Sequence, residues 1–162
     1  MPSPLIAPAR LHAVDGAFDV PAPHTTEEIA CLVRLARQYD ARTVAIGHGP
    51  GTAPAVAAFA RAWAAAGGEV VQTVLWPDQA ASWLRHANRF VEHDPDLWVM
   101  TGAPAGTAHM IRRLTWSTPW RADRTLGFAS LAHPGIAALA GPEHLQGLRG
   151  ATAQGRVWRA VG

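Results

Sequence analysis

Apolar positions follow two spacings along the chain, and together they predict strands that alternate with helices. Residues 43–46 form a short apolar run, which is typical of a buried parallel strand. After a glycine-rich turn, residues 54–66 place apolar side chains at helical spacing, and consecutive glycines then end the predicted helix. Residues 69–75 predict a second strand. The stretch 42–71 therefore predicts a βαβ unit, a motif whose crossover is right-handed in nearly all proteins.

The same alternation continues to the end of the chain. We expect further helices over 25–38, 77–92, 109–114 and 134–140, and further strands over 97–100, 126–129, 148–152 and 157–158. Between them, residues 116–124 are expected to form a loop. Strands that alternate with helices predict an α/β fold, here a three-layer, doubly wound, mostly parallel sheet of the flavodoxin or Rossmann kind.

Prolines set the start of the chain apart from the rest. Residues 1–24 are interrupted by proline and are expected to form an extended N-terminal arm on the surface, with 11–14 as a short edge strand. Residues 25–162 are expected to form a single α/β domain, because a chain of 162 residues suits one domain with a sizeable core.

The composition narrows the classes of function. The net charge is +2 and the arginines are scattered along a chain without lysine, so no basic surface for nucleic acid is expected. Cys31 is the only cysteine and falls on an apolar helix face, which predicts a buried thiol rather than a disulfide or a nucleophile. No apolar run approaches about 20 residues and no targeting signal is visible, so we expect a cytoplasmic protein without membrane insertion.

Candidate site residues gather where the predicted strands end, because sites on parallel sheets lie beyond the carboxyl ends of the strands. The candidate ligand-binding residues are His48, Gly49, Gly51, Thr52, Thr101, Gly102, Ala103, Ser130 and His133. The turn 47–52 could bind an anion through its backbone N–H groups. It has neither the lysine of a P-loop nor the spacing of a dinucleotide-binding motif. We therefore expect no nucleotide site there, and leave open a structural turn or contact with a small ligand.

The sequence gives less support to serine hydrolysis and to metal binding. Ser130 lacks the flanking glycines of a nucleophile elbow, which argues against a serine hydrolase. The eight histidines show no H-x-x-x-H or H-E-x-x-H spacing. Neither a metal site nor a bound cofactor is therefore predicted.

Four segments, taken in order, carry a family resemblance. They are the helix start 25–28 before the strand 41–46, the helix and G-x-x-V-V strand over 58–71, the Pro-Asp strand start over 94–99, and the segment 141–148. Together they resemble the second lobe of a type I periplasmic binding protein of the branched-chain amino-acid-binding kind. The resemblance covers residues 25–158 and implies the fold of one lobe, with ligand contacts from the turn 101–103.

The chain also departs from the family that it resembles. That family has two lobes, which close on a ligand, whereas this chain has length for only one. The aromatic or Asp residue often found in the turn after the opening strand is replaced by residues 48–51. The resemblance therefore implies the fold more directly than it implies ligand capture by closure of two lobes.

Two functions follow as hypotheses. The leading one is a non-catalytic module that binds a small polar molecule or a protein partner and resembles one lobe of an ABC-transporter substrate-binding protein. The alternative is a small cytoplasmic enzyme or enzyme subunit, in which His48 acts as acid or base while Thr101 and Ser130 orient the substrate. In that alternative His48 is expected to be exposed and to titrate near neutral pH.

Tryptophans predict how the chain assembles. Trp63, Trp83 and Trp98 are expected in the core, and Trp116, Trp120 and Trp158 are expected at an open edge of the sheet. Because no second lobe covers that edge, we predict a homodimer with residues 1–23 or 116–120 in its interface. Light scattering of the full chain should give the mass of a dimer. The competing outcome is a monomer whose arm folds back over its own edge, and a monomer at roughly tens of micromolar would contradict the dimer.

Overall fold

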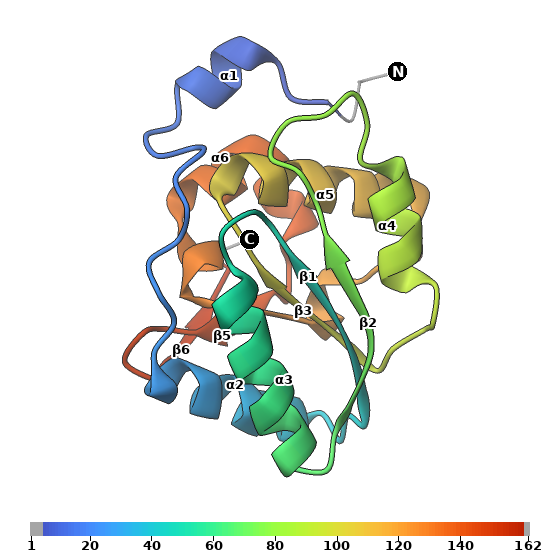
Figure 1. Cartoon of the computed structure of the whole chain (residues 1–162). Helices are drawn as coiled ribbons and strands as arrows, with labels where there is room; N and C mark the ends of the chain where they lie inside the picture. The colour runs from blue at the N-terminus through green and yellow to red at the C-terminus, as the bar shows by residue number, and fades with distance from the viewer. Residues whose placement is uncertain (1–4, 161–162) are drawn as a thin grey trace.

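The structure is a computed structural model that describes residues 5–160, and it is built on one six-stranded sheet (Figure 1). The strands are β1 (Thr43–His48), β2 (Glu69–Leu75), β3 (Leu97–Thr101), β4 (Thr125–Gly127), β5 (Arg149–Ala151) and β6 (Val157–Arg159). They lie in the order β2-β1-β3-β4-β5-β6, with β1 to β5 parallel and β6 antiparallel to β5. The mostly parallel sheet is thereby confirmed.

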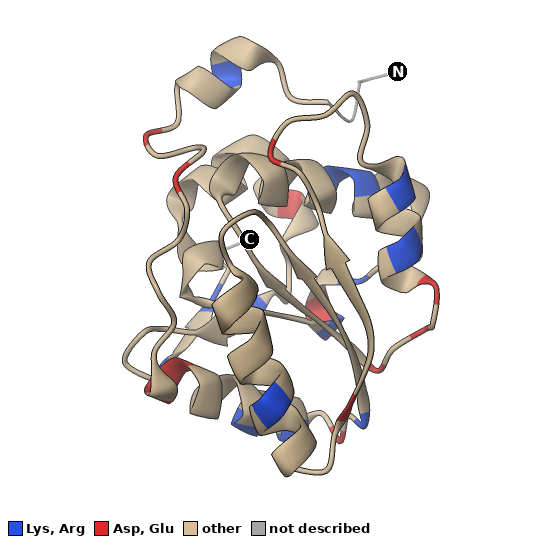
Figure 2. Cartoon of the chain, in the orientation of Figure 1, with Lys and Arg blue, Asp and Glu red and all other residues tan. Residues whose placement is uncertain are grey.

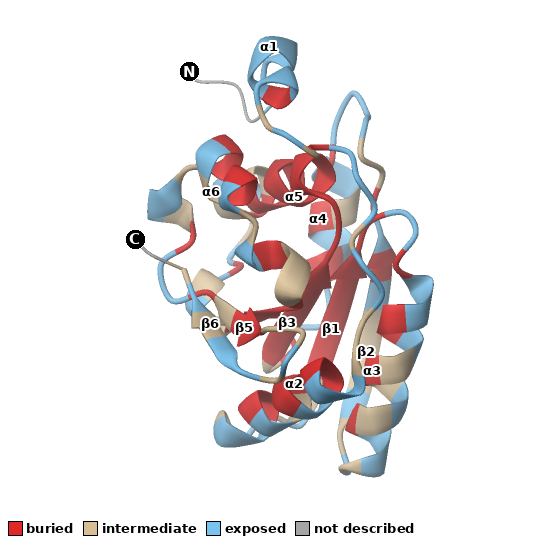
Figure 3. Cartoon of the chain, turned by 90° about the vertical axis from the view of Figure 1, so that its left-hand side faces the viewer, coloured by how far each residue is buried: buried red, intermediate tan, exposed pale blue. Residues whose placement is uncertain are grey.

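Helices cover both faces of this sheet, as a doubly wound fold requires (Figure 3). The α-helices are α1 (Pro8–His12), α2 (Thr26–Gln38), α3 (Ala53–Ala65), α4 (Leu84–Val91), α5 (Pro104–Ser117) and α6 (Pro134–Ala140). Three short 3-10 helices, η1 (Ala122–Arg124), η2 (Ala129–Ala132) and η3 (Pro142–His144), lie between later elements. Because α2 and α3 pack on one face and α4, α5 and α6 on the other, the three-layer prediction is also confirmed.

Charged residues are spread over the helices and loops rather than gathered in one stripe (Figure 2). Within residues 5–160, no helix combines the length and the apolar character that crossing a membrane requires.

Successive side chains of β1 point to opposite faces, and this alternation divides the core in two. Val44 and Ile46 lie in the cluster with α2 and α3, whereas Ala45 lies in the cluster with α4, α5 and α6. All three side chains are fully buried. A side chain at Gly47 would clash with the ring of Trp76, so glycine at this position lets the Trp76 ring pack against β1.

The described part of the N-terminal arm, residues 5–24, packs onto its own domain through α1 and the residues just before it, and residues 1–4 of the expected arm lie outside the described residues. The Ile6 N–H donates to Nε2 of His109 in α5 at 3.2 Å. Arg10 donates from Nη2 to the carbonyl oxygen of Ala138 in α6 at 2.8 Å. The edge strand expected over 11–14 is wrong, because the arm lies over these helices rather than along β2 or β6, the strands at the two edges of the sheet.

The helix expected from residue 77 begins seven residues later, at Leu84. Residues 77–83 form a loop that is closed by the indole of Trp83, whose Nε1 donates to the carbonyl oxygen of Pro77 at 2.8 Å. Trp83 is buried, and this burial holds the loop against the domain. The apolar spacing in this segment therefore predicts the helix but not the residue where it starts.

The helix α5 is longer at both ends than the 109–114 that the sequence predicts. It runs from Pro104 to Ser117. Proline suits the first turn of a helix, since its φ is already helical and its missing N–H has no helical partner to lose. The loop expected over 116–124 is accordingly wrong at both ends, because Trp116 belongs to α5 and Ala122–Arg124 forms η1.

The tryptophans follow the prediction only in part. Trp63, Trp83 and Trp98 are buried, as expected. Trp120 is also buried, at 7% exposure, so its expected place at an open edge is wrong. Trp116 is 39% exposed and Trp158 is partly buried. The homodimer stays a prediction, with less exposed tryptophan surface than the sequence suggests.

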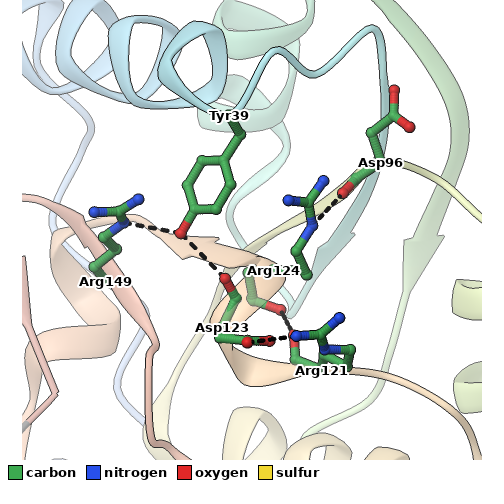
Figure 4. Close-up of polar contacts among 7 residues, drawn as sticks. Tyr39, Asp96, Arg121, Asp123, Arg124 and Arg149 are labelled. Atoms are coloured by element: carbon green, nitrogen blue, oxygen red, sulfur yellow. Dashed lines mark hydrogen bonds and ion pairs between the residues drawn. The ribbon is translucent and has the colours of Figure 1, made fainter.

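A polar network ties α2 to η1 and β5 at the amino end of the sheet (Figure 4). Tyr39 donates from Oη to the carbonyl oxygen of Asp123 at 3.1 Å and accepts from Nε of Arg149 at 2.9 Å. The guanidinium carbons of Arg124 and Arg149 lie 5.1 and 4.5 Å from the Tyr39 ring centroid, close enough for cation–π attraction. Arg124 also donates from Nε to the carbonyl oxygen of Asp96 at 3.1 Å.

Substitutions at Tyr39 should separate the two kinds of interaction in this network. Tyr39→Phe keeps the ring but removes the hydroxyl, and should lower the free energy of unfolding by about 0.5–1.5 kcal/mol. Tyr39→Leu also removes the aromatic face, and should lower it by about a further 0.5–1 kcal/mol. Urea denaturation of the wild type and both variants measures these differences. Equal stability of the wild type and Tyr39→Leu would show that the network contributes nothing.

Candidate functional site

The turns that follow β1, β3 and β4 meet at the carboxyl edge of the sheet. His48 pairs with Thr101 across β1 and β3, and Met100 pairs with Gly127 across β3 and β4. Because these strands are parallel neighbours, the chain leaves each of them at the same edge. The structure therefore brings together the three turns that hold the candidate residues.

A pocket of about 720 Å³ opens between these turns and the N-terminal arm. Six of the nine candidate residues line it, namely Gly51, Thr52, Thr101, Gly102, Ser130 and His133. The other three, His48, Gly49 and Ala103, are buried and lie outside the lining. The fold thus gathers most of the candidate residues around one space, and their contact with a ligand stays a prediction.

The remaining walls come from residues that the sequence did not indicate. Residues 19–24 of the arm form one wall, and Glu28 and Phe128 belong to another. The side chain of Val20 lies where a side chain at Gly51 would be, so the arm packs closely on the turn after β1. These segments are distant in sequence. The acidic start of α2 is the one signal near them, and it indicates a helix start rather than a pocket.

Glu28 joins the start of α2 to the turn after β4. Its Oε1 accepts from the Thr25 N–H at 3.2 Å while Thr25 Oγ1 accepts from the Glu28 N–H at 3.1 Å, which is a capping box. Its Oε2 accepts from the Ala129 N–H at 2.7 Å. The residue is only 3% exposed. A fixed carboxylate therefore forms part of the pocket wall.

His48 is held behind the pocket and is not the exposed residue that the enzyme hypothesis expects. Thr52 Oγ1 donates to the Gly49 carbonyl oxygen at 2.7 Å, so it must accept from Nδ1 of His48, which lies 3.0 Å away. His48 is 8% exposed. Burial lowers its pKa, and a hydrogen bond with the Gly49 backbone opposes this only in part. The expected exposure of His48 is therefore wrong, and burial lowers its pKa from the unperturbed value on which the hypothesis depends.

Ser130 and His133 form hydrogen bonds with different partners. The strand β4 stops at Gly127, so Ser130 lies in η2 and does not end the strand as expected. Its Oγ lies 3.1 Å from Oγ1 of Thr101 and accepts from the Gly102 N–H at 3.4 Å. His133 accepts from the Gly135 N–H at 2.9 Å through Nδ1 and caps α6. The two side chains therefore do not form a nucleophile–base pair in this structure.

The described residues offer no metal centre. Among residues 5–160, no group of three or more His, Cys, Asp or Glu side chains is arranged to hold an ion. The pocket lining instead carries hydroxyl groups, the carboxylates of Asp19 and Glu28, two imidazoles and apolar surface.

Stability should decrease as the pH falls below about 6.5, the value at which an unperturbed histidine titrates. Burial lowers the pKa of both His48 and His109, so the folded chain holds these protons less tightly than the unfolded chain does. Their contribution to stability is fully present above that pH and is lost as the pH falls through it toward the lowered values. Urea unfolding midpoints at about pH 7.5 and 5.5 measure the loss.

A variant of His48 isolates its share of this pH dependence. His48→Asn places an amide N–H close to the position of Nδ1, and should keep the contact with Thr52 while removing the titration. The difference between the two midpoints should become smaller in this variant. The exposed residue His12 provides a matched control, and His12→Asn should leave the difference unchanged. If both variants behaved like the wild type, His48 would have no part in the pH dependence.

Comparison with known proteins finds solved structures with a similar fold. No protein-family model matches the sequence, and neither does any curated protein. A substrate-binding periplasmic protein from Ralstonia solanacearum matches with a TM-score of 0.69 and 15% identity, over 93% of this chain and 43% of that protein. A branched-chain amino acid ABC transporter periplasmic ligand-binding protein from Burkholderia xenovorans LB400 matches with a TM-score of 0.61 and 18% identity, over 82% of this chain and 36% of that protein.

A third solved structure also has a similar fold at low sequence identity. A type 1 periplasmic binding protein from Bordetella pertussis Tohama I gives a TM-score of 0.63 and 21% identity, over 76% of this chain and 33% of that protein. The chain thus spans between about a third and somewhat over two fifths of the length of these three proteins. At such identities the likeness is one of fold, and it agrees with the six-stranded topology. The chain therefore has the fold of a single lobe of a type I periplasmic binding protein.

Proposed function

We propose that this chain is a non-catalytic binding module that holds a small polar molecule in the pocket at the carboxyl edge of its sheet. The observation that carries this proposal is the pocket itself, whose volume of about 720 Å³ lies within the usual range of small-molecule sites. It also lies where open α/β sheets usually bind their ligands. The matched structures include proteins described as substrate-binding or ligand-binding, which supports the same kind of function here.

The position of the N-terminal arm favours a binding site that a single lobe encloses without a second lobe. Residues 19–24 supply a wall that faces the strand ends across the pocket. The arm is fixed just before this wall, because the Ala105 N–H at the start of α5 donates to the carbonyl oxygen of Ala17 at 2.8 Å. A ligand would therefore be held between the sheet edge and the arm. A protein partner, the other occupant that the sequence leaves open, would have to displace part of this wall.

The enzyme hypothesis receives less support from the geometry. Its acid or base, His48, lies outside the pocket lining and has a partner at Nδ1 in Thr52. Ser130 bonds to Thr101 and Gly102 rather than to a base. The arrangement offers hydrogen-bonding groups that orient a molecule, and the binding module is accordingly the function that we put forward.

A screen of amino acids and other small polar compounds by thermal shift should identify a stabilising ligand. A ligand present at a hundred times its Kd stabilises the folded state by about 2.7 kcal/mol. For a domain of this size that should raise the Tm by roughly 5–11 °C. Calorimetry of the hits then gives the affinity, and absence of any hit would leave the proposal without support.

A pair of variants locates the bound molecule. Ala132→Phe adds a ring at an exposed position of the pocket lining, and should abolish the thermal shift by filling the space. Ala57→Phe adds the same ring at an exposed position of α3 outside the lining, and should preserve the shift. A ligand whose shift survives in both variants would bind elsewhere on the chain, and the proposed site would be wrong.

A further inference from the structure

We propose that the pocket selects molecules that carry a positive charge, such as a primary ammonium group on a short apolar skeleton. This inference rests on the proposed function, because it names the class of ligand for the same pocket. It follows from the charge of the lining, from the way in which nearby backbone N–H groups are already used, and from the apolar surface beside the buried carboxylate.

The charged side chains of the lining are acidic. Asp19 and Glu28 line the pocket together with two histidines, His24 and His133. No arginine is among the described lining residues, although the chain has 14 arginines and no lysine. The arm between α1 and α2 carries only acidic charges, as Figure 2 shows. An anionic ligand would therefore meet two carboxylates and no permanent positive charge.

Glu28 is placed to receive a cation. Each of its carboxylate oxygens accepts one backbone N–H, from Thr25 at 3.2 Å and from Ala129 at 2.7 Å. A carboxylate offers about four acceptor positions, so each oxygen keeps capacity for a further donor. The two existing bonds fix the group, and its 3% exposure removes it from bulk water. In such surroundings, attraction to an ammonium group and repulsion of a second carboxylate are both stronger than in water.

Backbone N–H groups that could hold an anion at this edge are engaged within the chain. The Gly102 N–H donates to Ser130 Oγ at 3.4 Å, and the Ala105 N–H donates to the carbonyl oxygen of Ala17 at 2.8 Å. The Ala129 N–H is taken by Glu28 itself. The anion site that the glycine-rich turn suggested loses one donor as well, because the Gly49 N–H donates to the Thr101 carbonyl oxygen at 3.0 Å.

Proline removes further donors from the helices that start at this edge. Pro54, Pro104 and Pro134 stand in the first turns of α3, α5 and α6. A proline has no N–H, so each of these helix starts offers one donor fewer than an anion-binding helix N-terminus normally does. The pocket is therefore poor in the groups that bind phosphate or carboxylate.

Apolar residues complete the match to an ammonium ion on a hydrocarbon skeleton. Phe128 lines the pocket and directly precedes Ala129, whose N–H binds Glu28. An aromatic ring attracts a cation to its face. Val20, Ala55 and several prolines supply the apolar contact area for the rest of the molecule.

Three compounds with one skeleton test the charge preference. Calorimetric titration at fixed ionic strength compares 3-methylbutylamine, 4-methylpentanoate and 3-methylbutanol, which present an ammonium, a carboxylate and a neutral hydroxyl. The amine should bind at least about tenfold more tightly than either of the others, a difference of about 1.4 kcal/mol. Equal or tighter binding of the acid or the alcohol would overturn the charge preference while leaving a binding module in place. If none of the three bound, the preference for an ammonium group on this skeleton would be overturned, while the thermal-shift screen would still decide the proposed function.

Variants of Glu28 and Asp19 test whether the preference for a positive charge comes from the carboxylates of the pocket lining. Glu28→Gln and Asp19→Asn remove the charge with little change of shape, and each should weaken amine binding by about threefold to tenfold without weakening alcohol binding. Asp19 is exposed on the arm, so its variant keeps the test valid if Glu28→Gln fails to fold. Asp15→Asn is the matched control on the arm outside the lining, and should leave amine binding unchanged. Amine affinity that is the same in Asp19→Asn and the wild type would overturn the assignment.

Discussion

The burial of β1 and β3 on both faces is the constraint on which the rest of the structure depends. Residues 44–49 of β1 and its turn, and all five residues of β3, are buried. Strands buried in this way need hydrogen-bonding neighbours on both sides and a helical layer on each face. The neighbours are β2 and β4, and the two layers are α2 with α3 and α4 with α5 and α6. Once these strands are parallel and central, their carboxyl ends are fixed side by side, and the turns that follow them meet at one edge.

The carboxyl edge is held by short hydrogen bonds between segments that are distant in sequence. Glu28 connects α2 to the turn after β4, and Ala17 of the arm accepts from the first turn of α5. Local hydrogen bonds add to these, because Thr52 bonds to His48 and to the Gly49 carbonyl oxygen within the turn after β1. These contacts use polar groups that would otherwise be unsatisfied in a buried position. As a result, several backbone donors at this edge are already occupied, and the carboxylate of Glu28 is held in place in the pocket wall.

The N-terminal arm adds a wall to the carboxyl edge of the single lobe. This chain matches less than half of the length of each of these three proteins, and its fold corresponds to one lobe of that architecture. Here residues 19–24 stand opposite the strand ends, where they narrow an otherwise open face. A fold hosts many functions, so the likeness alone does not assign one, and the case for ligand binding depends on the pocket.

The sequence by itself determined the order and type of most elements, because apolar spacing reflects which face of a strand or helix is buried. The βαβ unit from Thr43 to Leu75, the parallel sheet and the turns that meet at its edge all follow from such local patterns. What only the tertiary structure decided are the contacts between distant segments. No local pattern places Val20 against Gly51, turns Glu28 toward Ala129, or buries His48 and Trp120. Each of these depends on how the layers pack and on where the arm crosses the edge, since burial and pairing across the fold are properties of the whole chain rather than of a segment.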